Sequence, residues 1–260
     1  MKTFKTIFLA LAITFSFAAC EFKSPTEGFK VEGSIANFQD YSSNRIMAIV
    51  PDGRNFNAKI SESKFENNYF SMFLPYELKN NYCNIITTDN FILFDSLIIS
   101  SRNIKIGKVV FNSDNNFYSD GDVTQFGYTE KYNNGVADVT LVKTKYVYAQ
   151  SAMAIAGEYE TRLMHVFGED LYKTVKTNLR LQNGWNIIYY IGNYTSKPNT
   201  YYWEVDTAII NIIAEKPENI ELKWYYGFKG NFRDILRDNN AQFMAMPYIG
   251  SYYPDFIVNF

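Results

Sequence analysis

The chain has 260 residues, with 25 lysines and arginines against 27 aspartates and glutamates, and a formal net charge of −2 at pH 7. It carries no basic block, which argues against nucleic acid as a partner. The 22 phenylalanines and 21 tyrosines favour pleated, half-buried strands, and the 7 prolines and 14 glycines are too few for a disordered chain.

The first segment has the layout of a secretory signal peptide. Lys2 and Lys5 precede a run without charge from Thr6 to Ala19, which is a basic region followed by an apolar one. A membrane-spanning helix needs roughly 20 apolar residues, and this run is shorter and contains hydroxyl side chains. We therefore expect residues 1–19 to be a signal peptide.

The run ends in Phe17-Ala18-Ala19-Cys20, which resembles the lipobox of bacterial lipoproteins. In that family the cysteine thiol takes a diacylglyceryl group and the signal peptidase cuts before the modified cysteine; Phe17 departs from the leucine that is commonest at its position. The resemblance implies a lipid anchor on Cys20 and a place in the bacterial cell envelope, with the outer membrane expected. The alternative is a plain secretory signal that ends by chance in a cysteine.

Residues 20–28 contain a proline, a glycine and three charges, and we expect them to be a short tether. From Phe29 apolar residues recur at every second position, which predicts strands. The expected strands are near residues 31–35, 44–50, 56–60, 70–74, 82–87, 91–100 and 103–111. In the last of them the apolar phase changes at Gly107, which suggests a β-bulge.

Short strands at this spacing predict a β-sandwich over residues 29–111. Four pieces, Val31–Ile35, Asn44–Gly53, Phe70–Pro75 and Ile104–Phe111, resemble transthyretin-like domains, the family that includes carboxypeptidase regulatory-like modules. Such domains are commonly accessory modules without catalysis, and the resemblance supplies no functional residues.

Residues 112–122 are polar and predict a linker, followed by a second β-rich domain over residues 123–260. Asn134-Gly135 and Asn183-Gly184 each separate alternating runs and predict two-residue hairpins, in which Ala137, Val139 and Leu141 face inward after the first turn. Helix is expected to be scarce, with a turn or two at residues 163–171 and 232–238.

Candidate chemistry is sparse. His165 is the single histidine and lies in an apolar context, so a nucleophilic triad is not expected, and zinc lacks a ligand set. Cys83 is expected to be a buried small hydrophobe. The acidic segment Asp114–Asp122 departs from the order of a calcium loop and is interpreted as part of the linker.

Two aromatic clusters remain, and they supply the candidate binding residues Tyr202, Trp203, Trp224 and Tyr226. Adjacent strand residues point to opposite faces, so these rings either form a stacking platform for sugars or a partner protein, or pack in the core.

We expect an all-β, lipid-anchored protein of two sandwich-like domains that has no catalytic activity or cofactor and binds a glycan or a protein partner. A hydrolase with dispersed carboxylates in the second domain and a structural component of an envelope complex are the alternatives.

Overall fold

The computed structural model describes residues 24–37, 44–52, 56–85, 98–100, 104–113, 123–166, 169–198 and 203–226; for some strand residues, among them 161–166 and 203–205, it describes the backbone alone. The elements in chain order are β1 (Phe29–Ser34), β2 (Arg45–Asp52), β3 (Phe56–Lys64), β4 (Tyr69–Leu74), η2 (Asn80–Tyr82), β5 (Asn84–Ile85), β6 (Ile98–Ile99), β7 (Lys105–Ser113), β8 (Val123–Asn133), β9 (Val136–Ala149), β10 (Met153–Val166), β11 (Glu169–Leu181), β12 (Gly184–Pro198), β13 (Trp203–Ile213) and β14 (Lys223–Tyr226).

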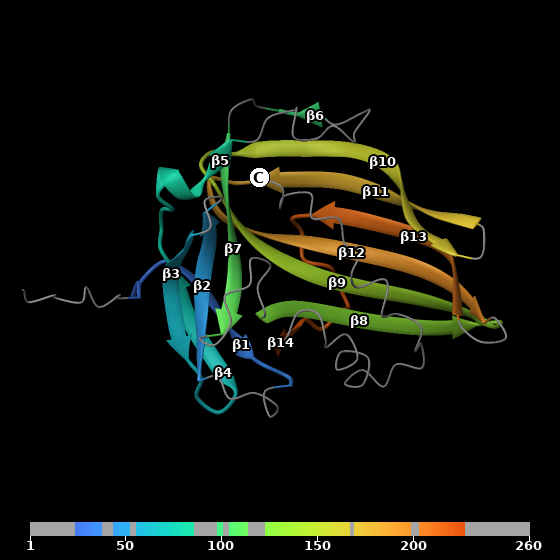
Figure 1. Cartoon of the computed structure of the whole chain (residues 1–260), viewed down its shortest axis with the longest axis horizontal. Helices are drawn as coiled ribbons and strands as arrows, with labels where there is room; N and C mark the ends of the chain where they lie inside the picture. Colours follow the sequence, from blue (N-terminus) through green and yellow to red (C-terminus); the bar gives the residue numbers. More distant parts are fainter. Residues whose placement is uncertain are drawn as a thin grey trace, which may run out of the picture.

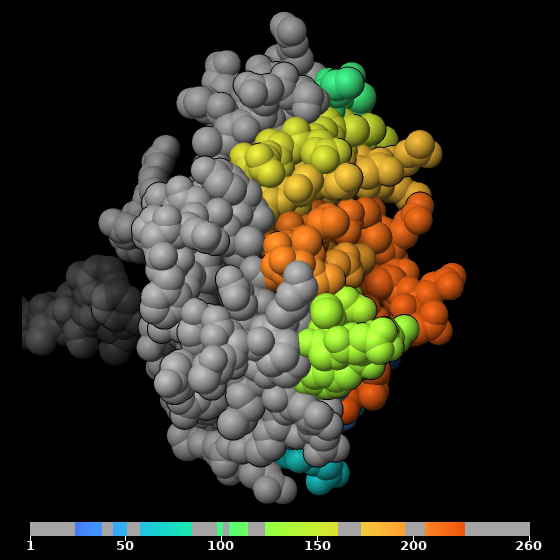
Figure 2. Space-filling model, turned by 90° about the vertical axis from the view of Figure 1, so that its right-hand side faces the viewer, coloured from blue at the N-terminus to red at the C-terminus, as the bar shows by residue number. Residues whose placement is uncertain are grey.

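The fold is all-β, as predicted, and the described residues contain a single 3-10 turn and no α-helix. β1 and β4 form a two-stranded sheet, and the other strands form a 12-stranded sheet in the order β3-β2-β7-β8-β9-β12-β13-β11-β10-β6, with β14 beside β8 and β5 beside β7 (Figure 1). In the side view, β6, β10, β11, β13 and β8 can be followed by their colours from top to bottom of the sheet (Figure 2). In the described part of the chain, no helix has the length and apolar character needed to cross a membrane.

Two hydrophobic clusters cover opposite faces of the long strands. The sandwich cluster lies between the β1–β4 sheet and the facing side of the large sheet, and it includes Phe70, Met72 and Leu74, the predicted inward face of β4. The long-strand cluster covers the other face, and it includes Ala137, Val139 and Leu141, also as predicted. Alternate residues of one strand feed the two clusters because successive side chains point to opposite faces.

This arrangement corrects the prediction of a bulge at Gly107. The pairing of β7 with β9 runs without a register shift from Ile106 to Val109. Ile106 belongs to the long-strand cluster, whereas Val109 and Phe111 belong to the sandwich cluster. The apolar phase changes because the strand is buried on both faces.

The predicted boundary at residues 112–122 lies mostly outside the described residues, so the division into two domains remains a prediction. The strands on its two sides share one sheet, since β7 pairs with β9. The sandwich cluster also takes Val123, Tyr146, Tyr148 and Trp224 from the second half. A change in sequence pattern at this point therefore does not interrupt the sheet.

The hairpin predicted at Asn134-Gly135 is confirmed. Both turn residues have positive φ, 50° and 77°, and Asn133 faces Val136 across the ladder between β8 and β9. This is the geometry of a type I′ turn, which suits the right-handed twist of the strands.

The hairpin predicted at Asn183-Gly184 is wrong. Gly184 has a φ of 98°, but Asn183 does not have a positive φ. β11 and β12 are not ladder partners, because β13 lies between them, parallel to β11 and antiparallel to β12. The prediction of helix near residues 163–171 is also wrong, since β10 continues to Val166 and β11 begins at Glu169.

The side chain of Asn186 ties the link between β11 and β12. Its Oδ1 accepts a hydrogen bond of 2.9 Å from the backbone N–H of Gln182, and its Nδ2 donates to the carbonyl oxygens of Gln182 and Gly184, each at 2.9 Å. These bonds satisfy backbone groups that a hairpin ladder would otherwise pair.

Candidate functional site

β14 carries two of the candidate binding aromatics, and it lies between β8 and the end of β1. It pairs with β8 from Lys223 to Tyr226, and Ile35 forms a parallel bridge with Trp224. The backbone N–H of Ala36 donates to the carbonyl oxygen of Trp224 at 2.8 Å. The strand is thus held from both edges.

The indole of Trp224 lies at the centre of the sandwich cluster and is only 2 % exposed. Its ring is 5.1 Å from Phe70, 5.3 Å from Phe111 and 5.9 Å from Tyr146, measured between centroids, and it is stacked on Tyr146. Its Nε1 donates to the carbonyl oxygen of Glu32 at 3.2 Å. Gly33 is required beside it, because a Cβ there would lie 2.4 Å from Trp224 Cδ1.

Of the two interpretations of Trp224 and Tyr226, a binding platform or core packing, burial supports core packing. Tyr226 is 3 % exposed and belongs to the same cluster. A ring enclosed on all sides cannot stack on a sugar, so core packing accounts for both residues.

The other candidate residues are less fully described. Tyr202 and Cys20 lie outside the described residues, as does the acidic segment 114–122, and the ring of Trp203 is not described. His165 pairs with Asp170 in the ladder between β10 and β11, with its backbone alone described. Binding at Tyr202 and Trp203 and lipidation at Cys20 remain predictions.

Cys83 is the free cysteine of the described residues and is buried, as predicted, at 6 % exposure. Its Sγ lies near Gly107, where an added Cβ would be 3.2 Å from the sulfur. Burial raises the pKa of the thiol to about 11, although Lys105 acts in the opposite direction. A thiol of this kind is protonated at neutral pH and is a poor nucleophile.

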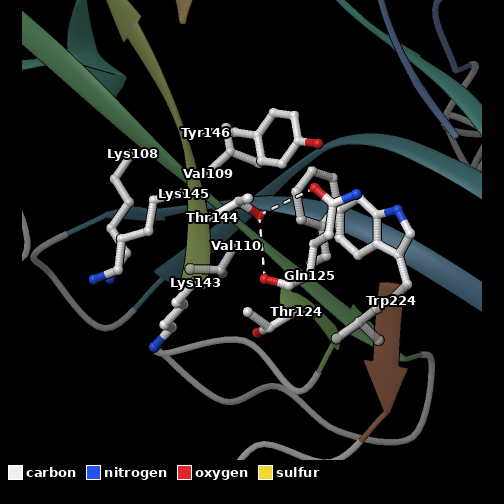
Figure 3. A pocket seen from close by; sticks show the side chains of 12 residues that line it. Lys108, Val109, Val110, Thr124, Gln125, Lys143, Thr144, Lys145, Tyr146 and Trp224 are labelled. Carbon is white, nitrogen blue, oxygen red and sulfur yellow. Dashed lines mark hydrogen bonds between the residues drawn. The ribbon is translucent and has the colours of Figure 1, made fainter. Parts of the chain in front are cut away.

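A small pocket opens in the sheet where β9 changes its partner. β8 pairs with β9 as far as Lys143, and β7 pairs with it from Tyr146 onward, so Thr144 and Lys145 lie at the fork between them. β7 and β8 themselves pair at Phe111 and Val123. The pocket is lined by residues 108–111, 123–125 and 143–146 and by Trp224 (Figure 3).

The fork pocket has a volume of about 30 Å³. That is room for a water molecule or two, whereas sites for organic ligands measure roughly 300–1,000 Å³. At one wall the hydroxyl of Thr144 donates to the backbone oxygen and to Oε1 of Gln125, at 3.4 and 3.3 Å (Figure 3). The pocket can therefore hold ordered water.

Two nearly buried lysines border the fork pocket. Lys143 and Lys145 are 5 % and 9 % exposed, on a face of β9 that is otherwise apolar. The ammonium of Lys145 lies 5.2 Å from the ring centroid of Tyr190, a cation–π contact that compensates for lost hydration. The sequence carries this signal, since two lysines interrupt the alternating Ala137, Val139 and Leu141 stripe, but our sequence analysis missed it.

The opposite face of β9, β12 and β13 is partly exposed. We call Thr140, Asn193, Thr195, Thr207 and Ile209 the outer face. Thr140 Oγ1 donates to Asn193 Oδ1 at 3.0 Å, the hydroxyls of Thr195 and Thr207 are hydrogen bonded, and Ile209 is 38 % exposed. A partly exposed surface of hydroxyl, amide and aliphatic groups is able to contact a large partner.

In the described part of the chain, no three His, Cys, Asp or Glu side chains are grouped so as to hold a metal ion. No family model, no curated protein and no solved structure matches the chain. The resemblances to lipoproteins and to transthyretin-like domains therefore remain predictions from the residues that carry them.

Proposed function

We propose that this protein is an exported lipoprotein of the bacterial cell envelope, anchored through acylated Cys20, that acts by binding and not by catalysis. The observation that carries the proposal is the sequence of the first segment: Lys2 and Lys5, the uncharged run from Thr6 to Ala19, and Cys20 directly after two alanines. Two or more acyl chains hold a protein firmly on a membrane without a spanning helix.

The fork pocket is not a site for an organic substrate. An enzyme for an organic substrate encloses most of that substrate, and a volume of about 30 Å³ is too small to do so. The outer face is the surface best suited to a glycan or a protein, because its threonine and asparagine side chains offer donors and acceptors beside an exposed isoleucine.

The anchor is tested with the two cysteines of the chain that follow Ala19. The full chain is expressed in a Gram-negative host as wild type, Cys20→Ala and Cys83→Ala, and each is followed by palmitate labelling and by detergent phase separation. We expect label and detergent partitioning in the wild type and in Cys83→Ala, and neither in Cys20→Ala. An unmodified mature N-terminus at another residue, found by intact mass, would contradict the proposal.

The binding role is tested by calorimetry of the mature protein with fragments of envelope polysaccharide and with purified envelope proteins. Saturable binding that Ile209→Glu weakens at least tenfold supports the outer face. Release of shorter glycans during the titration, detected by mass spectrometry, would favour the hydrolase alternative instead.

A further inference from the structure

Phe29 and Trp185 are in ring contact where the described chain enters the sandwich, and Trp185 is bonded to Pro75, the residue before Tyr76. We call Phe29, Tyr76 and Trp185 the entry patch. Phe29 is the first residue of β1 and faces Leu74, the last residue of β4, two positions before Tyr76. Trp185 is the second residue of β12, and its ring centroid is 6.5 Å from that of Phe29. The patch thus joins residues from both halves of the chain.

The entry patch is partly exposed, mainly through Tyr76. Trp185 Nε1 donates to the carbonyl oxygen of Pro75 at 2.6 Å, so its polar group is already satisfied. Trp185 and Phe29 are partly buried, packed against the sandwich cluster, and Tyr76 is 67 % exposed. The exposed charges within three positions of Phe29 or Tyr76 in the chain are Glu27, Lys30, Glu32, Glu77 and Lys79, and Lys30 is ion-paired with Glu32. They include no excess of positive charge that would favour anionic headgroups.

The tether limits how far this patch lies from the lipid of the proposed anchor. Phe29 lies nine positions after Cys20 in the sequence, with eight residues between them. Ser24 is held on β3, because its hydroxyl donates to the carbonyl oxygen of Glu62 at 3.1 Å and accepts from the Glu62 N–H at 2.9 Å. Four positions from Cys20 to Ser24 span at most about 13 Å, and the five from Ser24 to Phe29 at most about 17 Å, so the patch lies within about 30 Å of Cys20. Tryptophan and tyrosine favour the boundary between headgroups and acyl chains, where one end of the ring is wet and the other apolar.

We propose that the entry patch is the membrane-facing surface of this protein and that Tyr76 and Trp185 enter the interfacial layer of the bilayer that holds Cys20. The inference rests on the proposed lipid anchor and adds an orientation to it: β1, β4 and the start of β12 face the lipid. The far end of β12 then faces away from the membrane. Its last residue, Pro198, pairs with Trp203, roughly 40 Å from Trp185 along the strand.

The three tryptophans of the chain, at positions 185, 203 and 224, allow a direct test. The mature protein, with Cys83→Ala throughout, is coupled through Cys20 to a maleimide lipid in phosphatidylcholine vesicles whose acyl chains are brominated near the headgroup. Bromine quenches only nearby indoles. We expect Trp185→Phe to reduce the quenched fraction of the fluorescence at least threefold and Trp203→Phe to leave it unchanged.

A second variant guards against misfolding of Trp185→Phe, which loses the bond to Pro75. Tyr76→Glu changes an exposed side chain, and we expect it to reduce the quenching at least twofold, while Ile209→Glu on the outer face has no effect. Equal quenching in Trp185→Phe and wild type, or no quenching in wild type, would overturn the inference. Because coupling is chemical, these outcomes are independent of whether the cell lipidates Cys20, which the palmitate experiment decides.

Discussion

The side-chain amide of Asn37 pairs with the backbone of Tyr226, 189 positions later in the chain. The N–H of Tyr226 donates to Asn37 Oδ1 at 2.8 Å, and Asn37 Nδ2 donates to the carbonyl oxygen of Tyr226 at 2.9 Å. The amide of Asn37 thereby makes the two hydrogen bonds to Tyr226 that a neighbouring strand would make at the edge of β14 away from β8. Asn37 and Tyr226 are both buried.

Replacing this amide should destabilise the protein. Asn37→Ala leaves a buried N–H and a buried carbonyl without these bonds, and we expect a loss of about 2–4 kcal/mol in the free energy of unfolding. Urea denaturation measures it. The exposed Asn178→Ala on β11 is the matched control and should change stability by less than about 0.5 kcal/mol. Equal effects of the two variants would show that the Asn37 bonds do not hold β14.

Gly33 is expected to tolerate no side chain because of Trp224. In Gly33→Ala the new Cβ would lie 2.4 Å from Cδ1 and 2.6 Å from Nε1 of the indole. We expect overpacking to cost about 1–3 kcal/mol, with a change in the near-ultraviolet circular dichroism of the sandwich cluster. Ser34→Ala, at the next position and exposed, is the control. A neutral Gly33→Ala would place the indole elsewhere.

Asn186 should stabilise the link between β11 and β12. We expect Asn186→Ala to cost about 0.5–1.5 kcal/mol, because water can reach this half-buried position and replace part of the lost bonds. Asn186→Asp keeps the acceptor for the Gln182 N–H and loses the two donated bonds, so its cost should be intermediate when negative charge is screened by salt. Thermal unfolding of the three proteins gives the order, and a reversed order would rule out this role.

Cys83 should make stability depend on pH in the alkaline range. Its folded pKa of about 11 lies above the value of about 9 that an unfolded thiol has. The contribution is therefore complete below pH 9 and is lost as the pH rises through 11. We expect the difference in unfolding free energy between wild type and Cys83→Ala to shrink over this window; the shared tyrosines cancel in the comparison. A difference that is constant from pH 8 to pH 11 would contradict the assigned shift.

The buried thiol of Cys83 should also react slowly with disulfide reagents. At pH 8 an aromatic disulfide reagent should react with Cys83 in the folded protein at least a hundredfold more slowly than in urea, because both burial and the raised pKa keep the thiolate fraction small. Unacylated Cys20 in a soluble preparation serves as the fast internal reference. Similar rates for the two cysteines would mean that Cys83 is accessible.

Local patterns predicted the parts of the fold that local physics decides. The alternation of Ala137, Val139 and Leu141 gave the inward face of β9, and Asn134-Gly135 gave a type I′ turn. Gly107 misled the prediction because a strand buried on both faces has no single apolar phase. The sequence left open whether Trp224 binds a partner or packs in the core, since its burial depends on Phe70 and Phe111, which lie more than a hundred positions away in the chain.

The fork pocket was not predicted because it arises from a change of strand partner, which no local pattern encodes. Thr144 and Lys145 lie there only because β7 and β8 share one edge of β9. Lys143 and Lys145 do stand out in the sequence, because they are charged residues in an otherwise apolar stripe. The sequence does not show that a pocket lies beside them.

The position of β13 has a consequence for how the chain folds. Asn183-Gly184 favours a local hairpin of β11 with β12, which forms within microseconds, whereas the native sheet needs residues 203–213 to be inserted between those two strands. A hairpin that formed first would have to open before β13 could pair with both strands. During synthesis from the N-terminus, β11 and β12 are both available before residues 203–213, so the local hairpin competes with the native pairing until β13 is made.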